Sequence, residues 1–361
     1  MKFAVNMNSF IRDGLRSECI GGEWRWERQV LEALLLCPEV EKVSTFQPVW
    51  KSPHAMPSKL ADGLNKNEML DTICIFYYSI PVAAANKYKG MIINTHHFPH
   101  HDISTYSKFT EQYGSKWFFS YDRARPEAFM DKNYREIGCE NNWEPLPIPA
   151  VPQTYQGSNF NKKIILFPSK GIIGALRYPP MDWGSEGAPG KDMFTWVAKK
   201  LAEDSSMEFH VLSSYVQGDL DFLHCTDLEK EFFSFPITRC LTPYRDRIVV
   251  HRAIGWDQIL DLYSKTKIVV SSTGGGGMAM EAAAYGIPVV SHINTPMSLC
   301  PEYLEATLLS EKYFSMLDEL YYNESCYNRV GSGYRAFIEK HYTYKAFTDN
   351  LFSILKKRGM T

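Results

Sequence analysis

Residues 268–292 read IVVSSTGGGGMAMEAAAYGIPVVSH, and the pattern of this stretch decides the fold. Its apolar start predicts a short buried strand at 268–271, and its glycines predict a tight turn. A helix follows at 278–285, where Gly286 ends it before a second strand at 288–291. The stretch is therefore one repeat of the strand–helix–strand alternation that builds a parallel α/β sheet.

The glycines at 274–277 also indicate a ligand. Glycine lets a backbone pass close to a bound molecule, and a helix start offers unpaired N–H groups to an anion. Glu281 lies about one turn into the helix, where its carboxylate can reach the hydroxyls of a ribose. A turn that serves only close packing of strand and helix explains the glycines alone equally well.

The same alternation continues along the rest of the chain. Strands are predicted at 1–8, 72–78, 90–94, 117–120, 164–167, 209–212 and 248–251, and helices at 24–37, 193–201, 259–263 and 344–357. Residues 146–161, rich in Pro, Gly and Asn, predict a linker. We therefore expect an α/β protein of two Rossmann-like, doubly wound domains that face each other across a cleft, at 1–150 and 160–340.

The composition fits a globular protein and gives no sign of nucleic-acid binding. The 361 residues carry 39 basic and 41 acidic side chains, which give a formal net charge of −2. The chain therefore has no excess of positive charge that would favour binding to a polyanion. The first residues are too polar for a signal peptide, and no apolar run reaches the ~18–20 residues of a membrane span. The eight cysteines stand singly, as is typical of reduced thiols. We expect a cytoplasmic protein without a membrane span, with peripheral membrane contact left open.

The complete stretch at 268–292 resembles the donor-site motif of the GT-B glycosyltransferases. In that motif a strand, a Ser/Gly-rich loop, Glu-Ala and Gly-x-Pro-Val-Val follow in this order. By pattern the chain is most similar to the GT4 (glycogen-synthase-like) family, which has two glutamates separated by seven residues. Glu281 matches the second, and Thr273 stands in place of the first. The resemblance implies a GT-B fold and a nucleotide-sugar donor, and Thr273 leaves a retaining and an inverting course both open.

The resemblance assigns a role to each part of the chain. It implies that 1–150 is the acceptor side, that 160–340 binds the nucleotide-sugar, and that the helix within 341–361 returns toward the N-terminal domain. The donor-binding residues it implies are Gly22, Lys170, Lys191, Ala253, Ile254, Ser272, Thr273, Gly274, Gly275, Gly276, Gly277 and Glu281.

Two lysines stand where the resembled family carries cations. Lys170 ends the segment FPSK, and Lys191 follows Gly190 at the start of a predicted helix. The resemblance implies that both bind the donor diphosphate and act in catalysis, because ammonium groups stabilise a departing phosphate electrostatically. It therefore implies no metal ion and no other cofactor.

Four of the ten histidines lie in the segment 93–102, INTHHFPHHD. The resembled family places a histidine on the acceptor side just beyond a strand, so His96 is the candidate for a third catalytic residue. A second interpretation is metal binding, since His96 and His100 have the spacing of helical metal ligands, but Pro99 disfavours a helix here. A third interpretation is that these are ordinary loop histidines.

The sequence thus predicts a metal-independent glycosyltransferase of the kind found in polysaccharide biosynthesis. It would move a sugar from a nucleotide-diphosphate sugar to a glycan, a lipid-linked sugar or a small-molecule acceptor, with no nucleic acid as partner. Alternatives are a nucleotide-sugar 2-epimerase or another GT-B enzyme, although no carboxylate pair for epimerisation can be identified. A catalytically silent subunit that binds a sugar nucleotide is a further alternative, which Thr273 supports.

Overall fold

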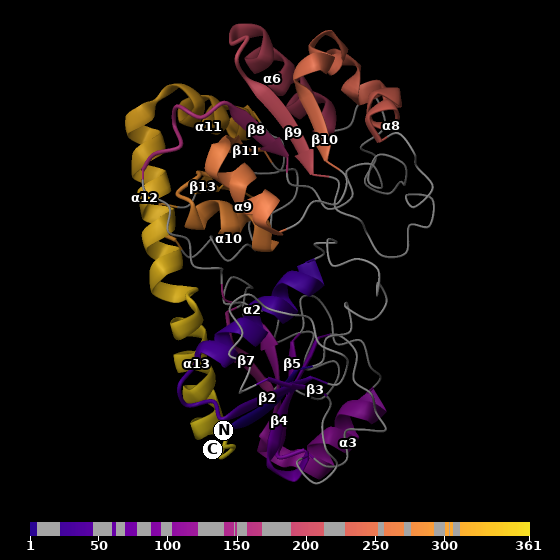
Figure 1. Cartoon of the computed structure of the whole chain (residues 1–361), viewed down its shortest axis with the longest axis vertical. Coiled ribbons are helices and arrows are strands. Elements are labelled where there is room, and N and C mark those ends of the chain that lie inside the picture. Colours follow the sequence, from indigo (N-terminus) through magenta and orange to yellow (C-terminus); the bar gives the residue numbers. More distant parts are fainter. Residues whose placement is uncertain are drawn as a thin grey trace. The chain divides into compact units, whose positions relative to one another are not determined.

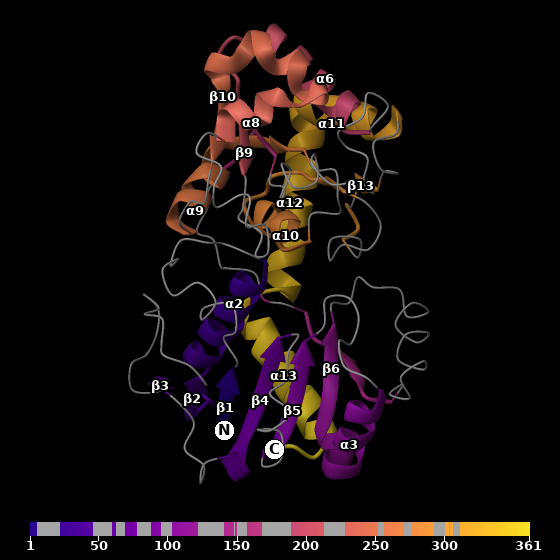
Figure 2. The same cartoon turned by 90° about the vertical axis from the view of Figure 1, so that its right-hand side faces the viewer.

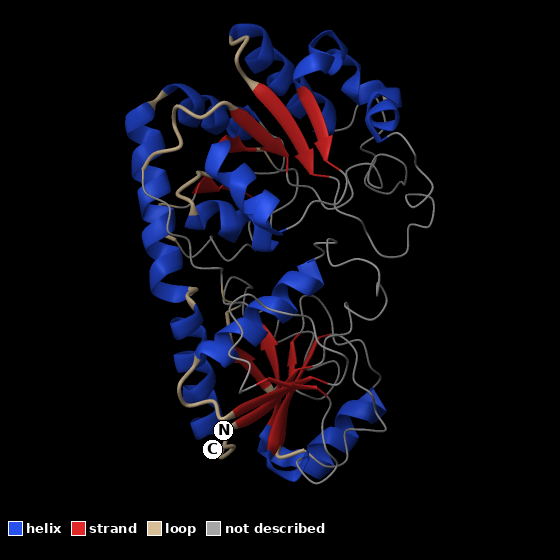
Figure 3. Cartoon of the chain, viewed as in Figure 1, coloured by secondary structure: helices blue, strands red, loops and turns tan. Residues whose placement is uncertain are grey.

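The computed structural model of the chain forms two compact α/β units, each with strands flanked by helices (Figures 1 and 3). The described residues up to 149, together with Glu339–Thr361, make the first unit, and those from 157 to Ile338 make the second. The structure describes residues 1–5, 22–45, 60–62, 69–77, 88–94, 103–121, 141–147, 149, 157–167, 189–212, 228–251, 256–270, 276–291, 300–302, 304–305 and 311–361, with the backbone alone for some of them.

The first unit is built on a parallel sheet. Its described strands are β1 (Lys2–Val5), β2 (Lys42–Thr45), β3 (Leu60–Asp62), β4 (Thr72–Tyr77), β5 (Gly90–Asn94), β6 (Trp117–Tyr121) and β7 (Trp143–Pro145). They are ordered β3-β2-β1-β4-β5-β6-β7, and every pair is parallel. The order reverses between β1 and β4, which is the doubly wound arrangement. Figure 2 shows β1, β4, β5 and β6 side by side.

Both faces of this sheet are covered, because successive strand residues point to opposite sides. The covering helices are α2 (Gly22–Leu36), α3 (Ile103–Tyr113) and α13 (Tyr344–Lys357), with short 3-10 turns at η1 (Met69–Asp71) and η3 (Gly114–Lys116). Ile73 of β4 lies in the core shared with α2 and α13, whereas its neighbour Cys74 lies in the core shared with α3. In the α3 core the Tyr106 ring stacks on Trp117 at 5.9 Å.

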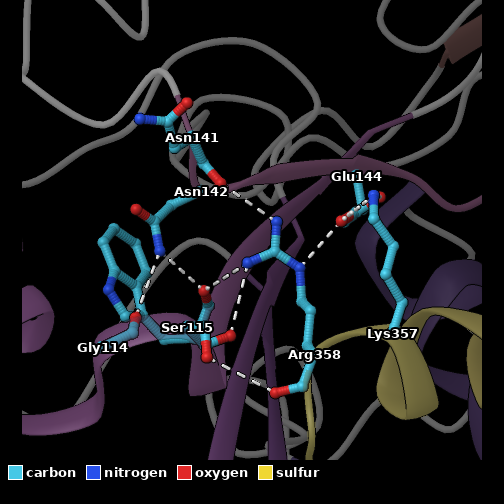
Figure 4. Close-up of polar contacts among 8 residues, drawn as sticks. Gly114, Ser115, Asn141, Asn142, Glu144, Lys357 and Arg358 are labelled. Carbon is cyan, nitrogen blue, oxygen red and sulfur yellow. Dashed lines mark hydrogen bonds and ion pairs between the residues drawn. The ribbon is translucent and has the colours of Figure 1, made fainter.

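Lys357 and Arg358, at the end of α13, bind to this unit through a charged cluster (Figure 4). The buried Glu144 of β7 accepts hydrogen bonds from Lys357 Nζ at 3.0 Å and from Arg358 Nε at 2.8 Å. The other Arg358 nitrogens donate to the carbonyls of Ser115 (3.3 Å), Trp117 (3.4 Å) and Asn141 (3.1 Å). Because the Arg358 side chain is only 9% exposed, this pair holds the end of α13 against β6 and β7 with little screening by solvent.

The second unit repeats the same plan. Its described strands are β8 (Ile164–Phe167), β9 (Glu208–Leu212), β10 (Ile248–His251), β11 (Thr266–Val269), β12 (Val290–Ser291) and β13 (Leu304–Glu305). The order is β10-β9-β8-β11, all parallel, and a bridge between Val269 and Val289 connects β11 to the parallel pair β12-β13. Its helices are α6 (Pro189–Glu203), α8 (Leu228–Ser234), η4 (Pro236–Arg247), α9 (Trp256–Lys265), α10 (Gly276–Ala284), α11 (Glu311–Tyr322) and α12 (Glu324–His341).

The prediction of a doubly wound α/β fold with two Rossmann-like units is confirmed. In the stretch that decided the fold, the bounds of both strands and of the helix differ from the prediction, since they are Thr266–Val269, Gly276–Ala284 and Val290–Ser291. The helix begins at Gly276 and not at 278, since the first helical N–H groups need no partner within the helix and glycine fits there. The strand begins at the polar Thr266 and not at 268, because Thr266 pairs with Ile164 of β8.

Candidate active site

The strand order of the second unit indicates where a fold of this kind binds a ligand. From β8 the sheet grows to one side through β9 and β10 and to the other through β11. In open α/β sheets a ligand binds outside the carboxyl ends of the strands, at the point where the order reverses. The strands on the two sides of this point are β8, which ends at Phe167, and β11, which ends at Val269. In the sequence, Lys170 and Ser272 follow these two strand ends.

The helix that follows β11 ends in a close contact between two glycines. Gly286 has φ +69°, and its N–H donates to the Ala283 carbonyl at 2.9 Å, which terminates α10. A Cβ at Gly331 of α12 would lie 2.1 Å from the Gly286 oxygen, so only glycine fits at this crossing. The Gly286 turn and the fit with α12 therefore set where α10 lies relative to β11.

Glu281 lies in α10, which begins within the predicted phosphate loop, and its side chain is only 4% exposed. The hydroxyl of Tyr263, at the end of α9, donates to Glu281 Oε2 at 3.1 Å. Tyr263 in turn stacks on Tyr285 at 5.7 Å, and burial, with the nearby Glu281 charge, raises the pKa of Tyr285 to about 12. Asn159 Nδ2 donates to the carbonyls of Tyr263 and Thr266 and so fixes the turn between α9 and β11.

This arrangement suits a carboxylate that accepts hydrogen bonds. A carboxylate oriented by one tyrosine hydroxyl in an apolar setting forms strong bonds to hydroxyl donors, because little water competes for it. The sequence analysis named Glu281 as a candidate donor contact and did not name Tyr263. Tyr263 is the last residue of the predicted helix at 259–263, but its contact with Glu281 depends on how α9 and α10 pack.

The other predicted donor residues are only partly described. Gly276 and Gly277 are the first residues of α10, Gly22 is the first residue of α2, and Lys191 lies in the first turn of α6, with only its backbone described. Lys170, Ala253, Ile254, Ser272, Thr273, Gly274 and Gly275 lie outside the described residues, as does His96, the second residue beyond the end of β5. Helices of a doubly wound sheet start at the carboxyl edge of the strands, so Lys191 and Gly276 belong to the same edge.

Among the described residues, no group of three or more His, Cys, Asp or Glu side chains is placed to hold a metal ion. The four clustered histidines of the segment 93–102 are outside those residues, so their metal-binding interpretation is neither supported nor contradicted. No helix in the described part of the chain combines the length and the apolar character that a membrane span needs.

No protein-family model and no curated protein matches the sequence. Solved structures match the fold. A glycosyltransferase from Rickettsia africae ESF-5 is similar over 99% of this chain and 98% of its own, with a TM-score of 0.63 and 9% identity. The trehalose-6-phosphate structure from E. coli bound with UDP-2-fluoro glucose is similar over 99% of both chains, with a TM-score of 0.61 and 11% identity.

A third similar structure, TarM, is longer than this chain. The similarity covers 80% of this chain and 56% of TarM, with a TM-score of 0.52 and 14% identity. The chain thus spans little more than half the length of TarM. Together with the strand orders of both units, these matches show that the chain has the GT-B fold.

Proposed function

We propose that the chain is a glycosyltransferase that moves a sugar from a nucleotide-diphosphate sugar to a glycan, a lipid-linked sugar or a small-molecule acceptor. The observation that carries this proposal is the match over nearly the whole length to a protein named a glycosyltransferase. The UDP-2-fluoro glucose named for the E. coli structure supports a nucleotide-sugar as donor. A fold alone hosts many functions, so the proposal also depends on the residues of the second unit.

Within the second unit, the donor would bind at the carboxyl ends of β8 and β11. Gly276 and Gly277 open α10, where helix N–H groups favour a phosphate. Glu281 would bind the ribose hydroxyls, supported by its buried position and its orientation by Tyr263. The loop residues 272–275 would complete the contacts to the donor within this unit, and Ala253 and Ile254 would contact the base. Gly22 is a further proposed donor contact.

The proposed chemistry needs positive charge at the leaving phosphate. Negative charge grows on the diphosphate as the sugar departs, and the ammonium groups of Lys170 and Lys191 would stabilise it. Lys191 in the first turn of α6 supports this role, since the helix start adds favourable partial charge. We infer a reaction that needs no metal ion, so activity should persist in EDTA.

His96 is the proposed catalytic residue on the acceptor side. It follows the carboxyl end of β5, a strand next to β4 and hence close to the reversal of strand order in the first unit. An imidazole there would act as base in an inverting reaction or would position the sugar in a retaining one. His96→Ala should lower the rate by roughly 10²–10⁴ with the fold intact, whereas His97→Ala should be tolerated.

A second candidate function is a sugar-nucleotide-binding subunit without transferase activity. Thr273 favours it, because a threonine stands at the position of the first family glutamate. The eight cysteines stand singly in the sequence, which supports a reducing, cytoplasmic location for either function.

Thermal unfolding with UDP, GDP, dTDP, ADP and CMP sugars tests the proposal. A bound donor at one hundred times its Kd should stabilise the protein by about 2.7 kcal/mol. Donor hydrolysis or transfer then separates an enzyme from a silent subunit. If none of these sugar nucleotides stabilises the protein, both the transferase and the sugar-nucleotide-binding subunit are contradicted.

A further inference from the structure

Three polar side chains of the second unit form a continuous hydrogen-bonded chain across β9 and β10. Glu208 Oε2 lies 2.9 Å from His210 Nε2, and His210 Nδ1 lies 2.9 Å from His251 Nε2. His210 is only 8% exposed, and its ring centroid lies 5.0 Å from that of His251. Sequence analysis does not reveal this series of hydrogen bonds, because its members are spread over two separate strands.

The hydrogen bonds determine which nitrogen of each neutral ring carries the proton. A carboxylate only accepts, so His210 Nε2 must carry the proton that Glu208 receives. His210 Nδ1 is then the acceptor, and His251 Nε2 is the donor to it. In a neutral His251 ring this leaves Nδ1 as a hydrogen-bond acceptor, and no residue that the structure describes bonds to it.

Both rings are neutral at ordinary pH. Burial lowers the pKa of His210, although the carboxylate of Glu208 opposes the shift. Burial and the neighbouring His210 lower the pKa of His251 to about 4. The acceptor character of His251 Nδ1 is thus a stable property of the site and not one of several states in exchange.

The position of His251 favours a ligand-facing role. His251 is the last residue of β10, at the carboxyl edge of the sheet where doubly wound folds bind ligands. β10 is two strands from β8, about 10 Å at the usual strand spacing, a span that a nucleoside diphosphate covers. Val249 lies on the same face of β10 and is 39% exposed, so the described residues leave this part of the face open.

We propose that His251 is a specificity-determining residue of the donor site, and that it selects a nucleobase whose ring carries an N–H. Its Nδ1 would accept a hydrogen bond from N3–H of uracil or thymine, or from N1–H of guanine. Glu208 and His210 are positioning residues that keep His251 in the accepting form. The inference depends on the proposed function, since it requires that the second unit binds a nucleotide.

The selectivity follows from pairing an acceptor with a donor. Cytosine N3 and adenine N1 carry lone pairs, so either base sets two acceptors against each other and loses the bond. A buried acceptor left without its donor costs the desolvation of that group, which corresponds to about tenfold in affinity. The hydrogen bonds from Glu208 through His210 prevent His251 from switching to its other neutral tautomer. His251 therefore cannot avoid this cost by donating a hydrogen bond to the wrong base.

Calorimetric titration of the full chain with UDP and CDP, and with GDP and ADP, tests the inference. The wild type should prefer UDP over CDP, or GDP over ADP, by about tenfold, and His251→Phe should reduce this preference to about twofold. Glu208→Gln should also weaken the preference, by about threefold, because the amide no longer fixes the His210 proton. The control is Glu229→Gln, which removes a carboxylate elsewhere in the unit whose exposure is similar to that of Glu208. It should leave the preference between the bases unchanged.

Nitrogen-15 NMR of the wild-type histidines gives a second measurement if His251→Phe fails to fold. It should find Nδ1 of His251 unprotonated at pH 7, and proton exchange between its two nitrogens in Glu208→Gln. A preference that survives in His251→Phe, equal binding of both bases by the wild type, or a protonated Nδ1 overturns the inference and leaves the proposed function standing. A wild type that binds neither these four nucleotides nor dTDP overturns the proposed function, and the inference with it.

Discussion

Lys267→Met should make the protein more stable near neutral pH, although it removes a charged residue from the middle of a unit. Lys267 of β11 is only 9% exposed, and its Nζ lies 4.0 Å from the Phe160 ring centroid and 4.5 Å from that of Tyr321. No carboxylate bonds to it among the described residues. Burial, reinforced by Lys163, lowers the pKa of Lys267 from 10.5 to about 8.

The size of the effect follows from this pKa. A shift of roughly 2.5 units at 1.36 kcal/mol each means that the charged form costs the folded state about 3 kcal/mol below pH 8. The contacts of the charged Lys267 with the two rings stabilise the folded state by roughly 0.5–1 kcal/mol each. Methionine keeps the apolar stem without the charge, so Lys267→Met should raise the free energy of unfolding at pH 7 by about 1–2 kcal/mol.

The pH dependence has a definite sign. The folded state binds fewer protons than the unfolded state between pH 8 and 10.5, so wild-type stability should gain a rising contribution over this window. Lys267→Met should lose that contribution. Urea unfolding at pH 7 and pH 10 measures both effects.

The matched control is Lys265→Met, since Lys265 is 57% exposed and paired with Asp261 on the same helix. It should change stability by less than about 0.5 kcal/mol. A Lys267→Met protein that is less stable than the wild type at pH 7, with the same pH dependence, would refute the reasoning.

Three further substitutions test contacts described above. Gly331→Ala should cost about 2–3 kcal/mol in urea unfolding, because the new Cβ meets the Gly286 carbonyl, and a cost below about 0.5 kcal/mol would mean that α12 moves away freely. Glu144→Ala should cost about 3 kcal/mol, since it leaves the Arg358 guanidinium buried without its carboxylate; an unchanged melting curve would contradict this. Glu281→Gln should weaken nucleotide binding by roughly 1–3 kcal/mol, and calorimetry with unchanged affinity would remove its proposed ribose contact.

The sequence predicted best those helices and strands whose bounds are determined by the residues within them. β8 and α13 have the predicted bounds, because a run of four buried apolar residues and a spaced apolar stripe each indicate one structure. By contrast, the prediction missed α12, whose interior glycines weaken helix propensity. Gly331 stands there to fit the Gly286 turn, a partner that lies far from it in sequence.

The candidate site shows the same division. The strand–turn–helix segment that contains the glycines and Glu281 could be predicted from the sequence, because that pattern is local, and the donor contacts of these residues stay a prediction. The hydrogen bond from Tyr263 and the chain from Glu208 to His251 depend on neighbouring strands and helices, and local periodicity carries no record of them.

The cluster of Glu144 with Arg358 has a consequence for how the protein is made. Its two partners are 214 residues apart, so the ribosome finishes β7 long before it reaches Arg358. At a translation rate of roughly 5–20 residues per second, some tens of seconds pass between the synthesis of β7 and that of α13, the helix that covers the first sheet. During that interval Ile73 and the apolar face of α2 lack the cover that Phe347 and Leu351 later give them. The first unit is thus translated first and completed last, and while the second unit is being made this nascent sheet is the segment that a chaperone would bind.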